Sequence, residues 1–261
     1  MKDVSTLRVG VVNYGAGNLH SVVRALDQVG AAPVIVDTPL KPSSLDVLLL
    51  PGVGAFSAAL ERLEQSGLRD WICEWAASGL PLVGICLGMH LLYEEGFEGG
   101  TDLPGLGLLK GQVERLPCQP GLQVPHMGWN QVRWRAGGPG LQAEMLAERL
   151  GGKPAPGAAE DHQYYYFAHS YYPTGVREEE VYATVRVGAS DGIYLDLPAV
   201  VGRGSLVCFQ FHPEKSGEAG LKLLAKSLEF CHSPQSATGS CAREKETTEK
   251  GGAAGADHSS R

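Results

Sequence analysis

The sequence has no excess of positive charge, no closely paired cysteines and no long apolar run. Its 261 residues carry 22 Lys and Arg against 29 Asp and Glu, giving a net charge of −7, whereas a nucleic-acid surface usually carries a basic patch. The 6 cysteines stand at 73, 86, 118, 208, 231 and 241 without a C-x-x-C pair, which disfavours a zinc site or a disulfide framework. We therefore expect a cytoplasmic protein that binds no nucleic acid and no structural metal.

Membrane contact is also not expected. No stretch approaches the ~20 apolar residues that a membrane-spanning helix needs. The first four residues, Met-Lys-Asp-Val, are too polar and acidic to begin a signal peptide.

Strand-like and helix-like segments alternate in the first part of the chain. We expect strands at 7–12, 33–36, 47–50 and 82–85, with helices at 19–29, 56–78 and from 89 onward. Asn18 is expected to cap the first helix. Later strands are expected at 111–116, 130–135, 164–172, 181–187 and 199–211, before a last helix at 221–228. This order predicts a three-layer α/β/α fold with a central, mostly parallel sheet.

Two regions depart from this compact plan. Residues 136–161 begin and end in Gly- and Pro-rich segments and are interpreted as a surface insertion within one domain spanning 1–232. Residues 233–261 contain no aromatics and are rich in small and charged residues, so a disordered tail is expected there.

The segment Gly84-Ile85-Cys86-Leu87-Gly88 lies between a buried strand and a helix-like run. A nucleophile flanked by glycines at such a sharp turn is typical of the G-x-S-x-G elbow, here with cysteine. The N-terminus of the following helix would favour the thiolate. The alternative is an ordinary buried cysteine at the end of a strand.

A candidate base follows a later apolar strand, in the sequence His212-Pro213-Glu214. His212 could take the proton of the thiol, and Glu214 could hold the imidazole in the required tautomer. Two residues apart on an extended chain, their side chains would lie on one side. Taken alone, the segment could also be a surface turn.

The loop Pro51-Gly52-Val53-Gly54 follows the strand at 47–50. In elbow enzymes an oxyanion hole combines the N–H group after the nucleophile, here that of Leu87, with one from a neighbouring loop, here that of Val53 or Gly54. The alternative is a plain turn between a strand and a helix.

Together these segments resemble the class I, triad-type glutamine amidotransferases. Tyr14–Asn18, Pro125–Asn130, Tyr164–Tyr171 and Phe209–Ser216 are similar, more narrowly, to the glutaminase subunits of imidazole glycerol phosphate synthase. The resemblance covers roughly residues 7–231 and implies a flavodoxin-like fold. It also implies a catalytic triad of Cys86, His212 and Glu214, with no cofactor and no metal.

The resemblance further implies two sets of binding residues. Glutamine would contact Gly52, Gly54, His90, Glu98, His169 and Ser170. A (β/α)8 synthase subunit, in a heterodimer, would contact Asn13, Tyr14, Asn18, Met127, Trp129, Asn130, Tyr166 and Lys215. Relatives mostly carry glutamine at position 90. A neutral imidazole cannot offer a donor and an acceptor from one terminal group, as a side-chain amide does. His20, His126 and His162 are expected to be structural.

The implied activity is hydrolysis of glutamine to glutamate and ammonia. The ammonia would pass to the partner, which makes imidazole glycerol phosphate and AICAR in histidine biosynthesis. Alternatives are another triad-type amidotransferase subunit, a stand-alone Cys hydrolase of γ-glutamyl substrates, and a silent subunit that only binds and regulates a partner.

Overall fold

The computed structural model describes residues 4–15, 17–98, 101–135, 163–188 and 194–232. The insertion expected at 136–161 and the tail expected at 233–261 lie outside these described residues. Within them, no helix combines the length and the apolar character needed to cross a membrane.

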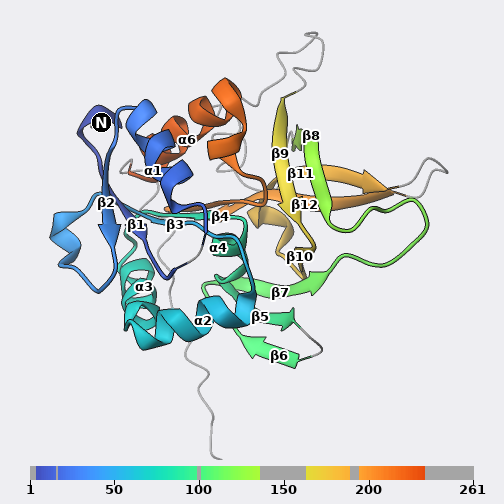
Figure 1. Cartoon of the computed structure of the whole chain (residues 1–261), viewed down its shortest axis with the longest axis horizontal. Helices are drawn as coiled ribbons and strands as arrows, with labels where there is room; N and C mark the ends of the chain where they lie inside the picture. The colour runs from blue at the N-terminus through green and yellow to red at the C-terminus, as the bar shows by residue number, and fades with distance from the viewer. Residues whose placement is uncertain (1–3, 16, 99–100, 136–162, 189–193, 233–261) are drawn as a thin grey trace, which may run out of the picture.

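A nine-stranded sheet forms the centre of the fold (Figure 1). In spatial order its strands are β2 (Ala32–Val36), β1 (Arg8–Val12), β3 (Val47–Leu50), β4 (Leu82–Ile85), β13 (Leu206–Phe209), β12 (Tyr194–Arg203), β11 (Val181–Gly188), β8 (His126–Trp134) and β9 (Tyr164–His169). The strands from β2 to β13 run parallel, and the pairs from β13 to β9 are antiparallel. The predicted α/β class with a large central sheet is confirmed.

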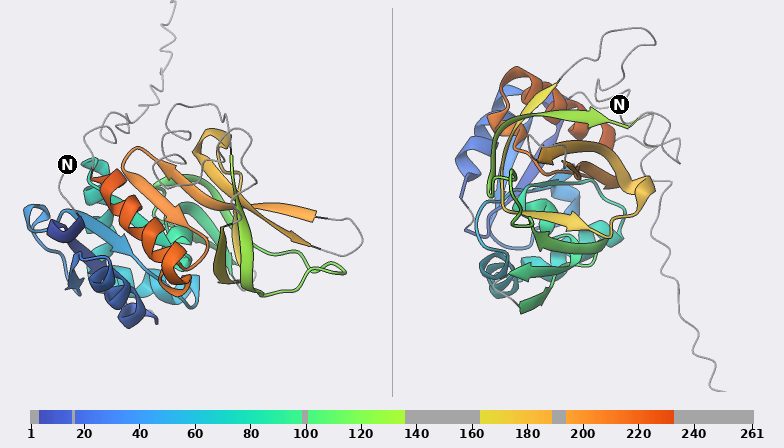
Figure 2. Two further views of the ribbon diagram at one scale, coloured as in Figure 1. Left: turned by 90° about the horizontal axis from the view of Figure 1, so that it is seen from above. Right: turned by 90° about the vertical axis from the view of Figure 1, so that its right-hand side faces the viewer.

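Helices cover both faces of the parallel half. In Figures 1 and 2, α1 (Leu19–Gln28) and α6 (Gly217–Cys231) lie on one face, and α2 (Phe56–Gln65) and α3 (Leu68–Ala77) lie on the other. Successive strand residues point to opposite faces, so a central strand such as β3 contributes to two separate apolar clusters. Leu49 packs in the cluster under α1 and α6, whereas Leu48 and Leu50 pack in the cluster under α2 and α3.

A smaller sheet lies beside α2. Its strands are β10 (Tyr171–Thr174), β7 (Leu109–Arg115), β5 (Tyr93–Glu98) and β6 (Thr101–Pro104). Strands β5 and β6 were not expected from the sequence. Short 3-10 turns are η1 (Val4–Thr6), η2 (Pro42–Ser44), η3 (Glu178–Glu180) and η4 (Pro213–Lys215).

Four predicted elements are divided or much shorter in the structure. The strand expected at 164–172 is two strands, β9 in the large sheet and β10 in the smaller one. The single helix expected at 56–78 is two helices, because Gly67 adopts a left-handed φ of 69° between them. The strand expected at 199–211 is a hairpin of β12 and β13 with a turn at Gly204, whose φ is 59°. The helix expected from 89 is α4 (Leu87–His90), and the chain enters β5 directly after it.

Gly88 lets α4 lie directly against the end of β3. A Cβ atom at this position would lie 1.8 Å from the carbonyl oxygen of Leu50. The carbonyl oxygen belongs to the backbone of a packed strand, and the position of a Cβ atom is fixed by its own backbone. Neither atom can therefore rotate away. The close approach fixes where the turn at Cys86 sits relative to the loop after β3.

We expect Gly88→Ala to lower the free energy of unfolding by about 3 kcal/mol, because the added methyl overpacks a rigid contact. Gly79→Ala is the matched control, because Gly79 has a φ of 71° but open space around its Cβ position. That control should lose only about 1 kcal/mol from backbone strain. Urea unfolding of both variants measures the difference, and equal losses would contradict the clash.

Candidate active site

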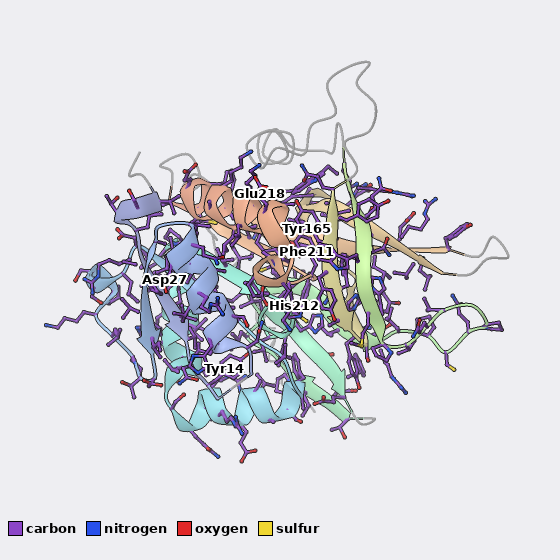
Figure 3. The ribbon with its side chains drawn as sticks, turned by 45° about the horizontal axis from the view of Figure 1, so that its top comes forward. Tyr14, Asp27, Tyr165, Phe211, His212 and Glu218 are labelled. Atoms are coloured by element: carbon purple, nitrogen blue, oxygen red, sulfur yellow. The ribbon has the colours of Figure 1, made fainter. Side chains whose placement is uncertain are left out.

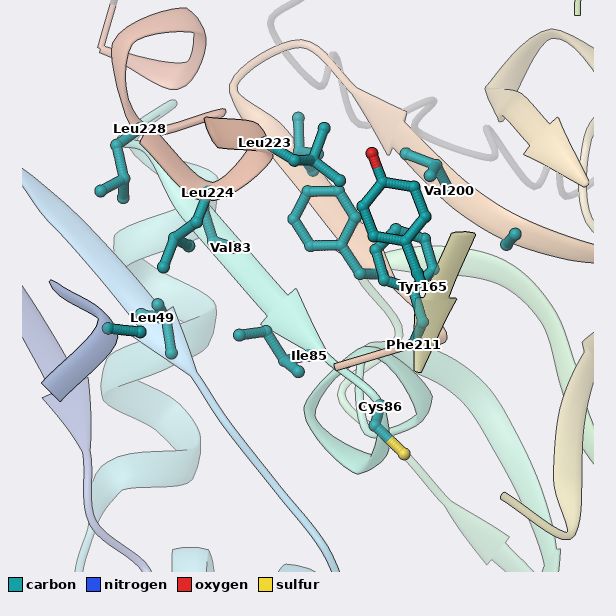
Figure 4. Close-up of a cluster of buried hydrophobic side chains, with 14 of the residues drawn as sticks. Leu49, Val83, Ile85, Cys86, Tyr165, Val200, Phe211, Leu223, Leu224 and Leu228 are labelled. Atoms are coloured by element: carbon teal, nitrogen blue, oxygen red, sulfur yellow. The ribbon is translucent and has the colours of Figure 1, made fainter. Parts of the chain in front are cut away.

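The turn after β4 places Cys86 in a strained backbone conformation. Its φ of 51° and ψ of −109° are unusual for a residue with a side chain. The Cys86 N–H donates to the Phe209 carbonyl oxygen at 2.7 Å, which holds the turn against the end of β13. The side chain points away from the apolar cluster under α6 (Figure 4). The predicted strand–turn–helix geometry is confirmed.

His212 and Glu214 reach this turn because β13 is paired with β4. The register aligns Phe209 with Ile85, so the chain leaving β13 runs past Cys86. His212 Nδ1 and Glu214 Oε1 lie 2.7 Å apart, and both side chains are buried. Figure 3 shows His212 near the centre of the molecule. The predicted pairing is confirmed, but the extended geometry expected for it is wrong. Glu214 lies in the 3-10 turn η4, which brings its carboxylate back toward the ring.

The His212 ring favours its protonated form. Burial lowers its pKa, but the neighbouring Cys86 and the Glu214 carboxylate raise it more strongly, to about 9. The Nε2 atom is buried, and among the described residues it has no partner in hydrogen-bond geometry. Cys86 lies close enough to the ring to raise its pKa but makes no well-aligned hydrogen bond with it in this conformation, an arrangement suited to proton transfer after a small adjustment.

Asn18 contributes to the same group of side chains. It was expected to cap α1 and to face a partner, but it makes no side-chain capping bond and has a left-handed φ of 74°. Its Nδ2 instead donates to Glu214 Oε1, the oxygen that also contacts His212. Asn18 does occupy the N-cap position of α1, as expected, but its side chain makes no capping bond because the long-range carboxylate competes for the amide. Sequence reasoning had no signal for this contact between residues nearly two hundred positions apart.

Cys86 opens onto a cavity of about 400 Å³. Five of the predicted glutamine-binding positions line it together with Cys86, namely Gly54, His90, Glu98, His169 and Ser170. Gly52 lies nearby but does not line it. The Glu98 carboxylate is fixed by Ser57, whose N–H and Oγ donate to Glu98 Oε2 at 2.9 and 2.8 Å. The cavity thus presents one anchored carboxylate, that of Glu98, together with Cys86. A carboxylate of this kind suits the ammonium group of an amino-acid substrate.

The predicted oxyanion donors are not all free. The Leu87 N–H donates to the Gly52 carbonyl oxygen at 3.4 Å, so in this conformation Gly52 occupies the place that an oxyanion would take. Tyr14 supports the same loop through a hydrogen bond from its hydroxyl to the Pro51 carbonyl oxygen, at 2.5 Å. The roles of Leu87, Val53 and Gly54 remain predictions that require this loop to reorient.

Two histidines form one hydrogen-bonded chain beside the cavity. His169 Nδ1 lies 2.9 Å from the Tyr171 carbonyl oxygen, which can only accept, so His169 Nε2 carries a lone pair. His126 Nδ1 therefore donates to it at 2.9 Å, and His126 Nε2 accepts from Asn130 Nδ2 at 3.1 Å. Burial lowers the pKa of His126 to about 4 and that of His169 to about 3, so both rings are neutral.

These hydrogen bonds affect the roles predicted for His169 and Asn130. Both ring nitrogens of His169 already have partners, so a contact with glutamine through its ring would have to break one of them. Asn130 was expected at a partner surface, but its amide points inward to His126 and to the Arg186 carbonyl oxygen. The structural role expected for His126 is confirmed, and His162 lies outside the described residues.

The remaining predicted partner residues divide by exposure. Met127 and Trp129 on β8 are 59% and 57% exposed, and Tyr166 on β9 packs edge-on against Trp129. Lys215 is also exposed. Tyr14 is only 4% exposed and its hydroxyl donates to the Pro51 carbonyl oxygen, so its side chain is not free for a partner in this conformation. Asn13 is held by Asp37 at 2.7 Å.

No group of three or more His, Cys, Asp or Glu side chains in the described ranges is arranged to hold a metal ion.

The sequence has relatives with known functions. A family model described as glutamine amidotransferase class-I matches residues 10–229. The chain is 44% identical over 222 residues to a Streptococcus gordonii protein named imidazole glycerol phosphate synthase subunit HisH, which covers 85% of this chain and 96% of that protein. A Bacillus licheniformis protein of the same name is 42% identical over 226 residues, with the same shares.

Solved structures show the same fold. A structure described as a glutamine amidotransferase superposes with a TM-score of 0.61 at 22% identity, covering 86% of this chain and 99% of its own. The structure of PurLQS from Thermotoga maritima gives a TM-score of 0.59 at 20% identity, covering 88% and 99%.

We expect the stabilising contribution of His212 to decline as the pH rises. Its pKa of about 9 lies above the ordinary value of 6.5, so folding favours the protonated ring. This contribution is complete below pH 6.5 and is lost as the pH rises through about 9. Between these limits the wild type should lose about 1–3 kcal/mol more of its free energy of unfolding than His212→Asn, measured with urea.

The control for this measurement is His20→Asn, which replaces an exposed histidine on α1 and should follow the wild type. An equal pH dependence in His212→Asn and the wild type would contradict the raised pKa.

Proposed function

Because the chain belongs to the class-I glutamine amidotransferase family, we propose that it is the glutaminase subunit of an imidazole glycerol phosphate synthase. It would hydrolyse glutamine and pass the ammonia to a (β/α)8 synthase subunit, which makes imidazole glycerol phosphate and AICAR for histidine biosynthesis in the cytoplasm. The observation that carries this proposal is the buried His212–Glu214 pair beside Cys86, which itself lines a substrate-sized cavity.

The proposed reaction is acyl transfer through a thioester. The Cys86 thiolate attacks the side-chain amide carbon of glutamine, and protonated His212 gives its proton to the leaving nitrogen, which departs as ammonia. Neutral His212 then takes a proton from water, whose oxygen attacks the thioester and releases glutamate and the thiolate. The Glu214 carboxylate holds the ring, and Asn18 holds the carboxylate. The scheme uses only groups of this chain and one water molecule.

Formation of the oxyanion hole is the step that would control this activity. The bond between the Leu87 N–H and the Gly52 carbonyl must break before that N–H can stabilise an oxyanion. Reorientation of residues 52–54 would also bring the Val53 or Gly54 N–H toward the substrate. Removing one such donor typically costs about 2.7–4 kcal/mol of transition-state stabilisation. We therefore expect slow turnover by the free subunit and faster turnover when a partner favours the reoriented loop.

The partner would dock on the exposed part of β8 and β9. In the antiparallel register Trp129 is opposite Tyr166 and Met127 is opposite Ala168, so these four side chains share one face. Ala168 and Met127 also line the cavity. Ammonia released there would therefore lie close to the docked partner, which protects it from protonation to unreactive ammonium in bulk water.

The first test removes the proposed nucleophile. In the complex with the (β/α)8 subunit, Cys86→Ala should reduce glutamine-dependent synthesis by about 10⁴-fold or more, because no thioester can form. Synthesis from added ammonium salts should be unchanged, since the partner carries that step. Cys73→Ala, at a half-buried position on α3, is the control and should retain both activities. Loss of both activities in Cys86→Ala would contradict this division of labour.

The same assay separates the remaining functions. Equal glutaminase turnover with and without the synthase subunit would indicate a stand-alone γ-glutamyl hydrolase. Stimulation by a different synthase would indicate another triad-type amidotransferase, and absence of turnover in every complex would indicate a silent subunit.

The second test concerns the docking face. Trp129→Ala should weaken binding to the (β/α)8 subunit by about 30-fold, as expected for a large aromatic at the centre of an interface. The control is Ile35→Ala, because Ile35 is 47% exposed on β2 at the opposite edge of the large sheet. Calorimetric titration measures both dissociation constants, and equal weakening by the two variants would place the interface elsewhere.

A further inference from the structure

A buried amide connects His90 with the sulfur of Cys86. Gln210 follows β13, is 0% exposed, and has Phe209 and Phe211 as neighbours in the chain. Its Oε1 lies 2.8 Å from His90 Nε2, and its Nε2 lies 4.0 Å from Cys86 Sγ. Its backbone N–H is already used by the Ala199 carbonyl oxygen at 2.9 Å, so the segment itself is fixed.

The protonation state of His90 sets the direction of these contacts. Burial lowers its pKa to about 4, against a smaller opposing effect from Gln210, so the ring is neutral and carries one N–H. With that hydrogen on Nε2, His90 donates to Gln210 Oε1. The amide NH₂ group is then turned toward Cys86, where it can only donate.

The surroundings of the sulfur make such a donor useful. The Ala168 carbonyl oxygen also lies 4.0 Å from Cys86 Sγ, and it can accept a hydrogen bond from the thiol but repels a thiolate. A donor from Gln210 counteracts this preference, because a hydrogen bond to the charged form favours that form.

We propose that Gln210 is a positioning residue for the Cys86 thiolate, with its amide orientation set by His90. Gln210 donates an N–H to the sulfur in its charged form, beside the contribution of His212. His90 would therefore act through Gln210, and its place in the cavity would be explained without a direct contact to glutamine. This inference rests on the proposed role of Cys86 as nucleophile.

Other titratable groups around the sulfur come from different elements. His212 precedes η4, His169 lies on β9, and Tyr14 follows β1. His169 is neutral, and burial together with Cys86 raises the pKa of Tyr14 well above its ordinary value, so Tyr14 is also neutral. Of these three groups His212 alone has its pKa, about 9, in the range of a cysteine titration, so a His212→Asn variant separates its effect from that of Gln210.

The experiment measures the pH dependence of alkylation of Cys86 by iodoacetamide in the full chain. Fragment-ion mass spectrometry assigns the modified sulfur and separates Cys86 from Cys73, which lies on the same tryptic peptide. Gln210→Met, which keeps the length of the side chain and removes the donor, should raise the apparent pKa of Cys86 by about one unit. At pH values below that pKa the alkylation rate should fall by about tenfold.

Variants at position 90 test the second link. His90→Phe removes the donor to Gln210 and should raise the apparent pKa of Cys86 in the same direction as Gln210→Met. His90→Gln restores an N–H donor and should bring the apparent pKa back toward the wild-type value. Because a role in packing alone would affect His90→Gln as well, this rescue distinguishes positioning from packing.

The three variants distinguish failure of the role of Gln210 from failure of the proposed function. If His212→Asn raises the pKa of Cys86 but Gln210→Met and His90→Phe do not, the role of Gln210 is wrong and the proposed function stands. If none of the three variants changes the titration, Cys86 is not an activated nucleophile, and both proposals fail. Thermal unfolding of each variant shows that the comparison is made on folded protein.

Discussion

The parallel pairing of β4 with β13 is the constraint on which the whole site depends. It aligns Ile85 with Phe209, and the bond from the Cys86 N–H to the Phe209 carbonyl closes the end of the ladder. The residues that follow the two strands therefore lie side by side, and Cys86 among them lines the cavity. A register shift of one residue would turn alternate side chains to the other face of the sheet, so apolar packing on both faces enforces the alignment. Gln210 and His212 reach the sulfur because of this register.

The histidines near the cavity differ in charge because their neighbours differ. Burial lowers the pKa of His90, His126 and His169, whose partners are amides, carbonyls or another imidazole. Burial acts on His212 too, but a carboxylate and a sulfur outweigh it and raise the pKa to about 9. Opposite shifts within one cavity are typical of sites that assign different tasks to similar groups. The rings of His90, His126 and His169 can stabilise the cavity wall, while the ring of His212 exchanges protons.

The strands β8 and β9 connect the cavity with the exposed face. Along β8, Met127 and Trp129 point outward, while His126 and Asn130 point inward. The inward pair belongs to the series of hydrogen bonds that ends at the Tyr171 carbonyl oxygen. A partner that presses on the outward side chains therefore acts on strands whose inward side chains support the cavity wall. Because Met127 and Ala168 also line the cavity, the proposed docking face and the proposed substrate site adjoin each other on these two strands.

Local sequence determined the strands of the parallel half, the glycine-flanked turn at Cys86 and the adjacency of His212 and Glu214, because periodicity, turn chemistry and near neighbours are properties of short segments. It did not reveal that Asn18 turns from its helix to Glu214, that Tyr14 is buried, or that Gly52 occupies the Leu87 N–H. Those outcomes depend on competition between partners far apart in the chain. Only the tertiary structure decides which partner is within reach, because the energy of a hydrogen bond depends on distance and direction that no short segment contains.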